Sequence, residues 1–385
     1  MTFDVAVVGL GGMGSAVVAH LAARGVRVVG LERFARGHAL GASTGKSRLI
    51  RRAYFEAPAY VPLLQRAYVL WDELERRSGE QVLTPTGLVM VGGAEGDILS
   101  RAHATAAQFA IPLEVLDTEA LRDRFPMLRI DDGERGLYES GAGMLAPERA
   151  VAAHLAMAEQ DGADLRFGCG AVRWTRDGDG FTIEADTGDA SRERGAALGA
   201  DRLVLALGPW AGDALRAFGI PLRIQRNVQA WFAPLADDLG VGRLPAFLFE
   251  RPAYPAPLYG FPDAGAGVKA AFHGSGETTS PDALDRVVHD GDLAPLRRAL
   301  ASAIPAAAGP VVDAKACMYA LTPDEHFVVG IDPRDPGIVV AAGFSGHGFK
   351  FCSVVGEICA DLATTGGTSH DIAFLAPQRF GDASS

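Results

Sequence analysis

The sequence contains few cysteines, and they do not follow a metal-binding pattern. Only four occur in 385 residues, and even the nearest two, Cys352 and Cys359, are not separated by the two to four residues typical of zinc ligands. This excludes a disulfide-built miniprotein and predicts no metal site. We expect the thiols to be reduced, as in a cytoplasmic protein.

Long apolar runs are also missing. No segment approaches the roughly 18 consecutive apolar residues that a membrane span requires, and the opening residues MTFDVAVVGLGG lack the basic segment of a secretory signal. We therefore expect no membrane association and a cytoplasmic location.

Basic residues are fewer than acidic residues. Lys and Arg total 36 against 47 Asp and Glu, which gives a net charge of −11. Such a balance repels phosphate backbones, so nucleic acid is not an expected partner. With 48% apolar and 22% charged residues, the chain has the composition of an ordinary globular protein, and its length suggests two or three domains.

A glycine motif stands at the start of the chain. Phe3–Val8 has the pattern of a buried parallel strand and is followed by Gly9-Leu10-Gly11-Gly12-Met13-Gly14, a helix-like segment Ser15–Arg24 and a second strand-like run, Val26–Leu31. In this βαβ context the motif predicts a dinucleotide site. Gly9 permits the tight turn, Gly11 lets the backbone approach a pyrophosphate, and Gly14 allows close packing of helix on strand.

An acidic residue follows the second strand of this unit. Glu32 stands where a carboxylate accepts hydrogen bonds from an adenosine ribose, which disfavours the 2′-phosphate of NADP.

Further segments predict a second domain built on an antiparallel sheet. Tyr60–Arg77 reads as an amphipathic helix, and Ala200–Leu207 and Ile338–Ala342 read as further buried strands of the nucleotide domain. Strand-like segments expected outside that domain are Leu83–Gly92, Val228–Phe232, Ala246–Glu250 and Val268–His273. We therefore expect an α/β protein with a discontinuous Rossmann-like domain, residues 1–83, 142–216 and 312–385. An α+β substrate domain would comprise residues 84–141 and 217–311.

Several motifs together carry a family resemblance over nearly the whole chain. These are Ser47-Arg48-Leu49-Ile50-Arg51, Tyr259-Gly260-Phe261-Pro262, Ala316-Cys317-Met318-Tyr319, Asp324-Glu325-His326-Phe327, and Ala342-Gly343-Phe344-Ser345-Gly346-His347-Gly348-Phe349-Lys350-Phe351. With the glycine motif, they make the chain resemble the family of monomeric sarcosine oxidase and N-methyltryptophan oxidase, flavoenzymes of the D-amino-acid oxidase superfamily.

The resemblance implies FAD as the cofactor, with Cys317 in the position that carries it through a thioether to the 8α carbon. From composition alone, Cys317 would read as a small buried apolar residue, so the linkage depends on the surrounding motif. Contacts with FAD are implied for Gly9, Gly11, Gly12, Met13, Gly14, Glu32, Arg33, Ser43, Ser47, Arg48, Leu49, Val172, Cys317, Gly346, Gly348, Phe349 and Lys350.

The resemblance also gathers cations from distant segments around the flavin. Arg51 and Lys350 match the pair that binds the substrate carboxylate, and Lys269 matches the lysine that activates oxygen near flavin N5. Arg48 would lie against the opposite flavin face, and His273 is a further catalytic candidate. Tyr259, Leu248 and Gly346 are expected to line the substrate pocket.

The implied reaction transfers hydride from the carbon beside a secondary amine to the flavin. Water then hydrolyses the imine, and O₂ reoxidises the flavin and becomes H₂O₂. The partners expected are thus an amino acid bearing a secondary amine and O₂, and a monomer is favoured.

Several positions depart from the sarcosine oxidase pattern, among them Trp231 and Phe249 near the expected pocket. Thr44 replaces a histidine beside the flavin, and Leu248 replaces a methionine of the pocket. These changes leave cyclic imino acids of the pipecolate or proline type as alternative substrates. A dehydrogenase that uses another electron acceptor also stays open, as does a nucleotide-binding protein without flavin chemistry.

Overall fold

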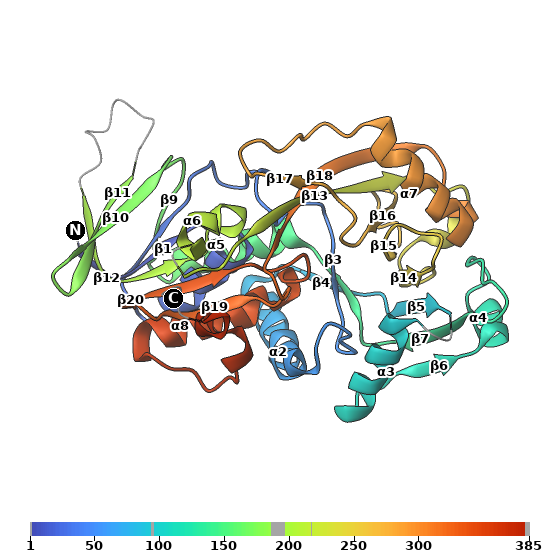
Figure 1. Ribbon diagram of the computed structural model, residues 1–385, viewed down its shortest axis with the longest axis horizontal. Coiled ribbons are helices and arrows are strands. Elements are labelled where there is room, and N and C mark those ends of the chain that lie inside the picture. The colour runs from blue at the N-terminus through green and yellow to red at the C-terminus, as the bar shows by residue number, and fades with distance from the viewer. Residues whose placement is uncertain (1, 94–95, 186–196, 217, 382–385) are drawn as a thin grey trace.

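Two large β-sheets make up the protein, in a computed structural model that describes residues 2–93, 96–185, 197–216 and 218–381. The eight-stranded sheet lies at the left of Figure 1 and the nine-stranded sheet at the right. A small three-stranded sheet comprises β3 (Arg48–Ile50), β4 (Leu83–Pro85) and β8 (Gly143–Leu145).

The eight-stranded sheet has a parallel centre. β1 (Thr2–Val8) lies between β2 (Val28–Leu31) and β12 (Leu198–Leu205), and β9 (Asp164–Arg166) and β20 (Asp335–Ala342) extend the parallel set. Antiparallel pairing adds β10 (Val172–Asp177), β11 (Gly180–Ala185) and β19 (Val328–Asp332). β1 and β2 are buried along most or all of their length, as expected for parallel strands covered on both faces.

Helices cover this sheet. α1 (Gly12–Ala23) contacts α5 (Pro147–Gln160) and α8 (Cys352–Thr365), and α8 in turn contacts α2 (Val61–Ser78). α1 is apolar on nearly every side, because neighbouring helices and strands enclose it. α6 (Gly212–Arg216) is a single short turn. Short 3₁₀ helices occur at Pro58–Tyr60, Gly208–Ala211, Asp237–Leu239, Pro305–Ala307, Phe349–Phe351, Ala373–Leu375 and Pro377–Phe380.

The nine-stranded sheet is antiparallel apart from one pair. Its strands are β5 (Leu88–Gly92), β6 (Glu114–Leu116), β7 (Arg135–Glu139), β13 (Arg223–Phe232), β14 (Ala246–Glu250), β15 (Leu258–Phe261), β16 (Val268–Phe272), β17 (Thr278–Thr279) and β18 (Val311–Leu321). Only β14 and β5 run parallel among the described strand pairs of this sheet. α7 (Asp290–Ala303) contacts β15 and β16, while α3 (Asp97–Gln108) contacts β5 and β7, and α4 (Thr118–Arg124) contacts β6 and β7.

The expected secondary structure is confirmed in most segments but wrong at Leu83–Gly92. That segment forms two strands in different sheets, β4 and β5, separated at Thr86 and Gly87. The amides of both residues donate to the Ala142 carbonyl, and Gly87 has a φ of +68° beside the Tyr138 ring. A continuous strand cannot make this turn, and glycine is the residue that tolerates it.

The expected domain boundaries stay a prediction. The strand pairing bears on one of them, the boundary at residue 312. β18 begins near the expected boundary at residue 312, yet it pairs with β13 of the nine-stranded sheet as far as Leu321. Another boundary was expected between residues 216 and 217, and residue 217 lies outside the described residues.

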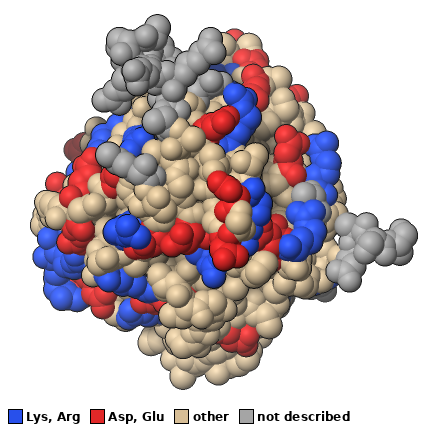
Figure 2. Space-filling view, turned by 90° about the vertical axis from the view of Figure 1, so that its left-hand side faces the viewer, with Lys and Arg blue, Asp and Glu red and all other residues tan. Residues whose placement is uncertain are grey.

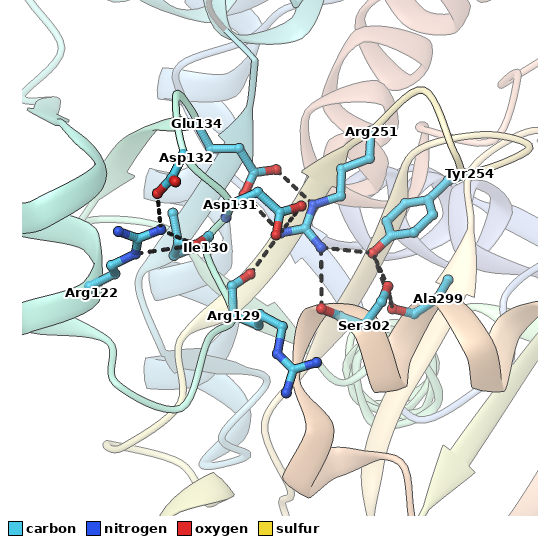
Figure 3. A network of polar contacts seen from close by, with 10 residues as sticks. All are labelled: Arg122, Arg129, Ile130, Asp131, Asp132, Glu134, Arg251, Tyr254, Ala299 and Ser302. Carbon is cyan, nitrogen blue, oxygen red and sulfur yellow. Dashed lines mark hydrogen bonds and ion pairs between the residues drawn. The ribbon is translucent and has the colours of Figure 1, made fainter.

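A buried arginine ties three segments of the nine-stranded half together (Figure 3). Arg251 donates to both carboxylate oxygens of Glu134, at 2.7 and 2.8 Å, and to the Arg129 carbonyl. It also donates to the Tyr254 hydroxyl and to the Ser302 carbonyl of α7. Because Arg251 and Glu134 are both almost fully buried, each depends on the other for its charge to be compensated.

Charges of both signs are interspersed on the face shown in Figure 2. Within the described residues, no helix is both long enough and apolar enough to span a bilayer.

Candidate functional site

The glycine turn between β1 and α1 brings the backbone close to neighbouring segments. Gly9 has a φ of +92°, and a Cβ there would lie 2.4 Å from the Ala206 carbonyl oxygen. At Gly14 a Cβ would lie 1.7 Å from the carbonyl oxygen of Gly9 itself. At Gly11 the nearest atom would be the Ser43 hydroxyl, 3.7 Å away. The open backbone at Gly11 and the crowded one at Gly9 and Gly14 fit the three roles predicted for these glycines.

The start of α1 is capped by a distant side chain. The Gly12 amide donates to the Ser43 hydroxyl at 3.0 Å. Glu32 lies beside this turn and accepts from the Leu10 and Phe34 amides, at 2.8 and 3.1 Å. Burial by itself raises the pKa of Glu32, but these amides and His38 outweigh it and lower the pKa. The ionised carboxylate thus stands at the predicted ribose end of the site.

A cavity of about 870 Å³ runs from the glycine turn to residues of the nine-stranded sheet. This volume is at the upper end for small-molecule sites and suits an extended ligand. Most residues expected at the site line it: Gly9, Gly11, Gly12, Met13, Glu32, Arg33, Ser43, Arg48, Leu49, Arg51, Val172, Leu248, Tyr259, His273, Cys317, Gly346, Gly348, Phe349 and Lys350. Gly14, Ser47 and Lys269 are not among the residues that line it.

Two buried cations meet at one part of the cavity. Arg51 bonds to the Glu56 carboxylate and to the Ala53 carbonyl, while its Nε is buried without a hydrogen-bond partner among the described residues. The Lys350 ammonium donates to the His347 carbonyl at 2.7 Å. Burial lowers the pKa of Lys350 to about 7, with Glu56 acting in the opposite direction. An unpaired buried donor is costly, so the free Nε of Arg51 points to a ligand acceptor.

Glu56 is the carboxylate at this part of the cavity, and sequence reasoning missed it. Burial alone would raise the pKa of Glu56, but the charges of Arg51 and Lys350 lower it to about 2. Because Glu56 lies in an irregular segment five residues after Arg51, no helix or strand period could have paired the two.

Lys269 contacts the segment that carries the cavity-lining residues Thr44 and Arg48. Its ammonium donates to the carbonyls of Gly45 and Ser47, at 2.7 and 2.9 Å, and lies 5.2 Å from the centre of the Trp231 ring. Burial, with Arg48 acting in the same direction, lowers the pKa of Lys269 well below its ordinary value. Thr44, which stands where the sarcosine oxidase pattern has a histidine, lines the cavity, and its carbonyl accepts from Arg48.

Cys317 and Tyr319 project from the same face of β18 into the cavity. The Tyr319 hydroxyl lies 3.3 Å from Nδ1 of His273. Burial raises the pKa of Cys317, Tyr259 and Tyr319 and lowers that of His273, so all four are neutral near pH 7. Tyr319 was not among the expected site residues, although two-residue strand periodicity from Cys317 identifies it.

The composition of the cavity wall fits FAD. A glycine-lined turn and a ribose-facing carboxylate lie at one end, and an unpaired arginine nitrogen, a lysine and a cysteine lie toward the other. These groups match the pyrophosphate, ribose and flavin parts of the cofactor in chemistry and in order.

Comparisons with known proteins agree with this reading. Residues 4–362 match the family described as DAO, FAD dependent oxidoreductase. The chain is 43% identical to a monomeric sarcosine oxidase of Streptomyces avermitilis, and the match covers 98% of each chain. It is 34% identical to an N-methyl-L-tryptophan oxidase of Salmonella arizonae, over 99% of this chain and all of the relative.

A solved structure of NikD, an unusual amino acid oxidase essential for nikkomycin biosynthesis, superposes with a TM-score of 0.83 at 25% identity. This superposition covers 98% of this chain and 97% of NikD. The chain therefore belongs to the DAO family of FAD-dependent oxidoreductases, beside monomeric sarcosine oxidase and N-methyltryptophan oxidase.

Proposed function

We propose that this enzyme oxidises N-methyl amino acids, sarcosine among them, with FAD as the hydride acceptor and O₂ as the final oxidant. The observation that carries the proposal is the meeting of Arg51 and Lys350, from opposite ends of the chain, in the cavity that contains the glycine turn. The names of the curated relatives support the same substrate class.

Arg51 and Lys350 would bind the substrate carboxylate. The unpaired Nε of Arg51 offers one donor, and its Nη2 now pairs with Glu56. A substrate carboxylate that took over this pairing would receive a planar two-donor contact from Arg51 and a point charge from Lys350. The anchor would then hold the carbon beside the amine in a fixed direction.

The remaining wall would suit a neutral amine. His273, Tyr259 and Tyr319 carry no charge near neutral pH and offer hydrogen-bonding atoms beside the two cations. A positive site also lowers the pKa of a bound amine, which favours the neutral form that can be oxidised to an imine.

FAD supplies hydride acceptance and electron transfer to O₂. Lys269 would contribute a fixed positive charge close to the cavity, which stabilises negative charge developing on oxygen. Arg48 would add a second cation, since it lines the cavity next to Thr44.

We also propose that Cys317 carries FAD covalently. Its side chain lines the cavity, and the cationic charges of Arg48 and Lys269 oppose the effect of burial on the pKa of its thiol. Those cations would favour the thiolate that forms the thioether.

A cyclic imino acid is the second candidate substrate. Leu248 and Phe55 bring apolar surface to the cavity near Arg51, and such a wall accommodates a saturated ring as readily as a methyl group.

The test is anaerobic mixing of the purified enzyme with sarcosine, N-methyltryptophan, L-proline or L-pipecolate while flavin absorbance is followed. Bleaching by an N-methyl amino acid supports the proposal, and bleaching by the cyclic acids alone favours the second candidate. Admission of O₂ should then restore the colour with one H₂O₂ per substrate. Recovery of colour only with an artificial quinone would instead identify a dehydrogenase.

By similarity to the monomeric relatives, we propose that the enzyme acts as a monomer. All four cysteines are buried and unpaired, which suits the reducing cytoplasm that we propose as its location.

A further inference from the structure

One aromatic ring contacts both cations of the carboxylate site. The guanidinium carbon of Arg51 lies 4.5 Å from the centre of the Tyr54 ring, and the ammonium of Lys350 lies 5.2 Å from it. Tyr54 is completely buried and stands behind the cavity wall that Arg51 and Lys350 line. Both distances are within the range of cation–π attraction, which is strongest where water is excluded.

The hydroxyl of Tyr54 is anchored in a defined direction. It lies 2.6 Å from Nδ1 of His347, whose Nε2 lies 3.1 Å from the Glu325 carbonyl. A carbonyl only accepts, so Nε2 of His347 carries the proton and Nδ1 accepts from Tyr54. Burial lowers the pKa of His347 to about 3, which keeps the imidazole neutral in this arrangement.

His347 links the two sides of this arrangement. Its carbonyl accepts from Lys350 at 2.7 Å, while its ring accepts from Tyr54. The ring of Tyr54 is therefore fixed relative to Lys350 through one residue and faces Arg51 directly.

We propose that Tyr54 is a positioning residue that holds Arg51 and Lys350 side by side in the cavity. This inference rests on the proposed function, in which Arg51 and Lys350 bind the substrate carboxylate. Glu56 can compensate only one of two buried like charges. A second carboxylate would compete with the substrate, whereas the face of an aromatic ring stabilises a cation and leaves its N–H donors free.

Tyr60 supplies a matched control. It is equally buried, and its ring centre lies 5.4 Å from that of Tyr54. Its hydroxyl bonds with His326 and the Phe327 amide, and among the described residues no cation lies over its ring. The Tyr60 ring also contacts that of His347, with ring centres 5.7 Å apart, so its loss should disturb the same aromatic cluster while the ring that faces Arg51 and Lys350 is kept.

The experiment compares Tyr54→Leu, Tyr54→Phe and Tyr60→Leu as FAD-loaded enzymes. KM and kcat are measured for sarcosine, and Ki is measured for acetate, which offers a carboxylate without an amine. Tyr54→Leu should raise KM and Ki by about tenfold with a smaller change in kcat, because the desolvated ring contact is lost. Tyr54→Phe, which keeps the ring, should fall within about threefold of the parent, as should Tyr60→Leu.

A thermal double-mutant cycle tests the same contact without substrate. If the ring stabilises the ammonium, the Tm changes caused by Tyr54→Leu and by Lys350→Met should not add, because the ring matters less once the cation is gone. Strictly additive Tm changes would overturn the role of Tyr54, and so would a KM increase in Tyr60→Leu equal to that in Tyr54→Leu.

Arg51→Gln separates this inference from the proposed function. If the acetate Ki and the sarcosine KM do not respond to Arg51→Gln, the carboxylate assignment fails. The thermal cycle then decides by itself whether Tyr54 holds the two cations.

Discussion

Glu56 accepts two hydrogen bonds from Nη2 of Arg51, at 2.8 and 2.6 Å, inside the cavity that the substrate would enter. This internal carboxylate occupies the arginine that we assign to the substrate carboxylate. The substrate must therefore compete with a group of the protein that has the same charge and the same geometry.

Glu56→Gln should tighten the binding of carboxylates. An amide is a weaker acceptor for a guanidinium than a carboxylate, so Arg51 is released at lower cost, and the acetate Ki should fall by about fivefold. Glu148→Gln is the matched control, because Glu148 also lines the cavity but accepts from the amides of Gly45 and Lys46. Weaker acetate binding in Glu56→Gln would show that Glu56 orients Arg51 and does not compete.

Lys269→Met should separate the two halves of the reaction. Reduction of the flavin by substrate should stay within about threefold of the parent, while reoxidation by O₂ should slow by about 100-fold, as on loss of a fixed charge beside a developing anion. Stopped-flow absorbance resolves both steps. Lys46→Met is the control, since Lys46 lies over the same Trp231 ring, at 4.7 Å, but is largely exposed and pairs with Asp313. Equal reoxidation rates in the parent and in Lys269→Met would show that Lys269 has no role in the reaction with O₂.

Lys350 should give a stability that depends on pH. Burial lowers its pKa from 10.5 to about 7, so between these values the unfolded chain binds the proton more tightly than the folded chain. The free energy of unfolding should therefore rise with pH across this window through this residue. At pH 6, where the buried amine is mostly protonated, Lys350→Met should raise the free energy of unfolding by about 1 kcal/mol.

The same titration should appear in binding. In the parent, the acetate Ki should increase as the pH rises through the pKa of Lys350, since the site loses a cation, and in Lys350→Met the Ki should be higher and flat. Urea denaturation and acetate inhibition at pH 6, 7, 8 and 9 measure both effects. A Ki that is independent of pH in the parent would contradict a titrating Lys350 in the site.

Arg251→Met tests the network that joins Glu134, Tyr254 and α7. The substitution leaves the Glu134 charge buried without its partner, so the free energy of unfolding should fall by about 3 kcal/mol. Arg122→Met removes an exposed arginine that pairs with Asp132 nearby and should cost under about 1 kcal/mol. Adding Glu134→Gln to Arg251→Met should recover part of the loss in urea denaturation. Equal losses of unfolding free energy in Arg251→Met and Arg122→Met would mean that burial does not strengthen the Arg251–Glu134 ion pair.

Sequence reasoning located the βαβ unit because each of its features has a local cause. Gly9 has a φ of +92°, a Cβ at Gly14 would meet the carbonyl oxygen of Gly9 in the same turn, and β1 ends in the buried apolar run Val5–Val8. Such requirements are visible in the sequence itself. Most of the site residues that the family resemblance implied, Cys317 and Lys350 among them, line the cavity.

The residues that were missed depend on tertiary contacts. Glu56 and Tyr54 lie in an irregular segment, and their partners follow from how the chain turns between β3 and α2. Lys269 was expected near the flavin, yet its ammonium is directed to the carbonyls of the turn at residues 45–47. The break at Gly87 similarly depends on Tyr138, more than 50 residues away, so a local strand pattern could not reveal it.

FAD should occupy this cavity with its flavin beside Cys317 and the cations. The most direct test is to precipitate the purified enzyme with acid, digest the washed protein and identify the flavin-bearing peptide by mass. We predict that the flavin colour stays with the protein, that the FAD mass is found on the peptide containing Cys317, and that Cys317→Ala releases the flavin. Complete recovery of the flavin in the supernatant of the parent, or its attachment to a peptide without Cys317, would contradict the account.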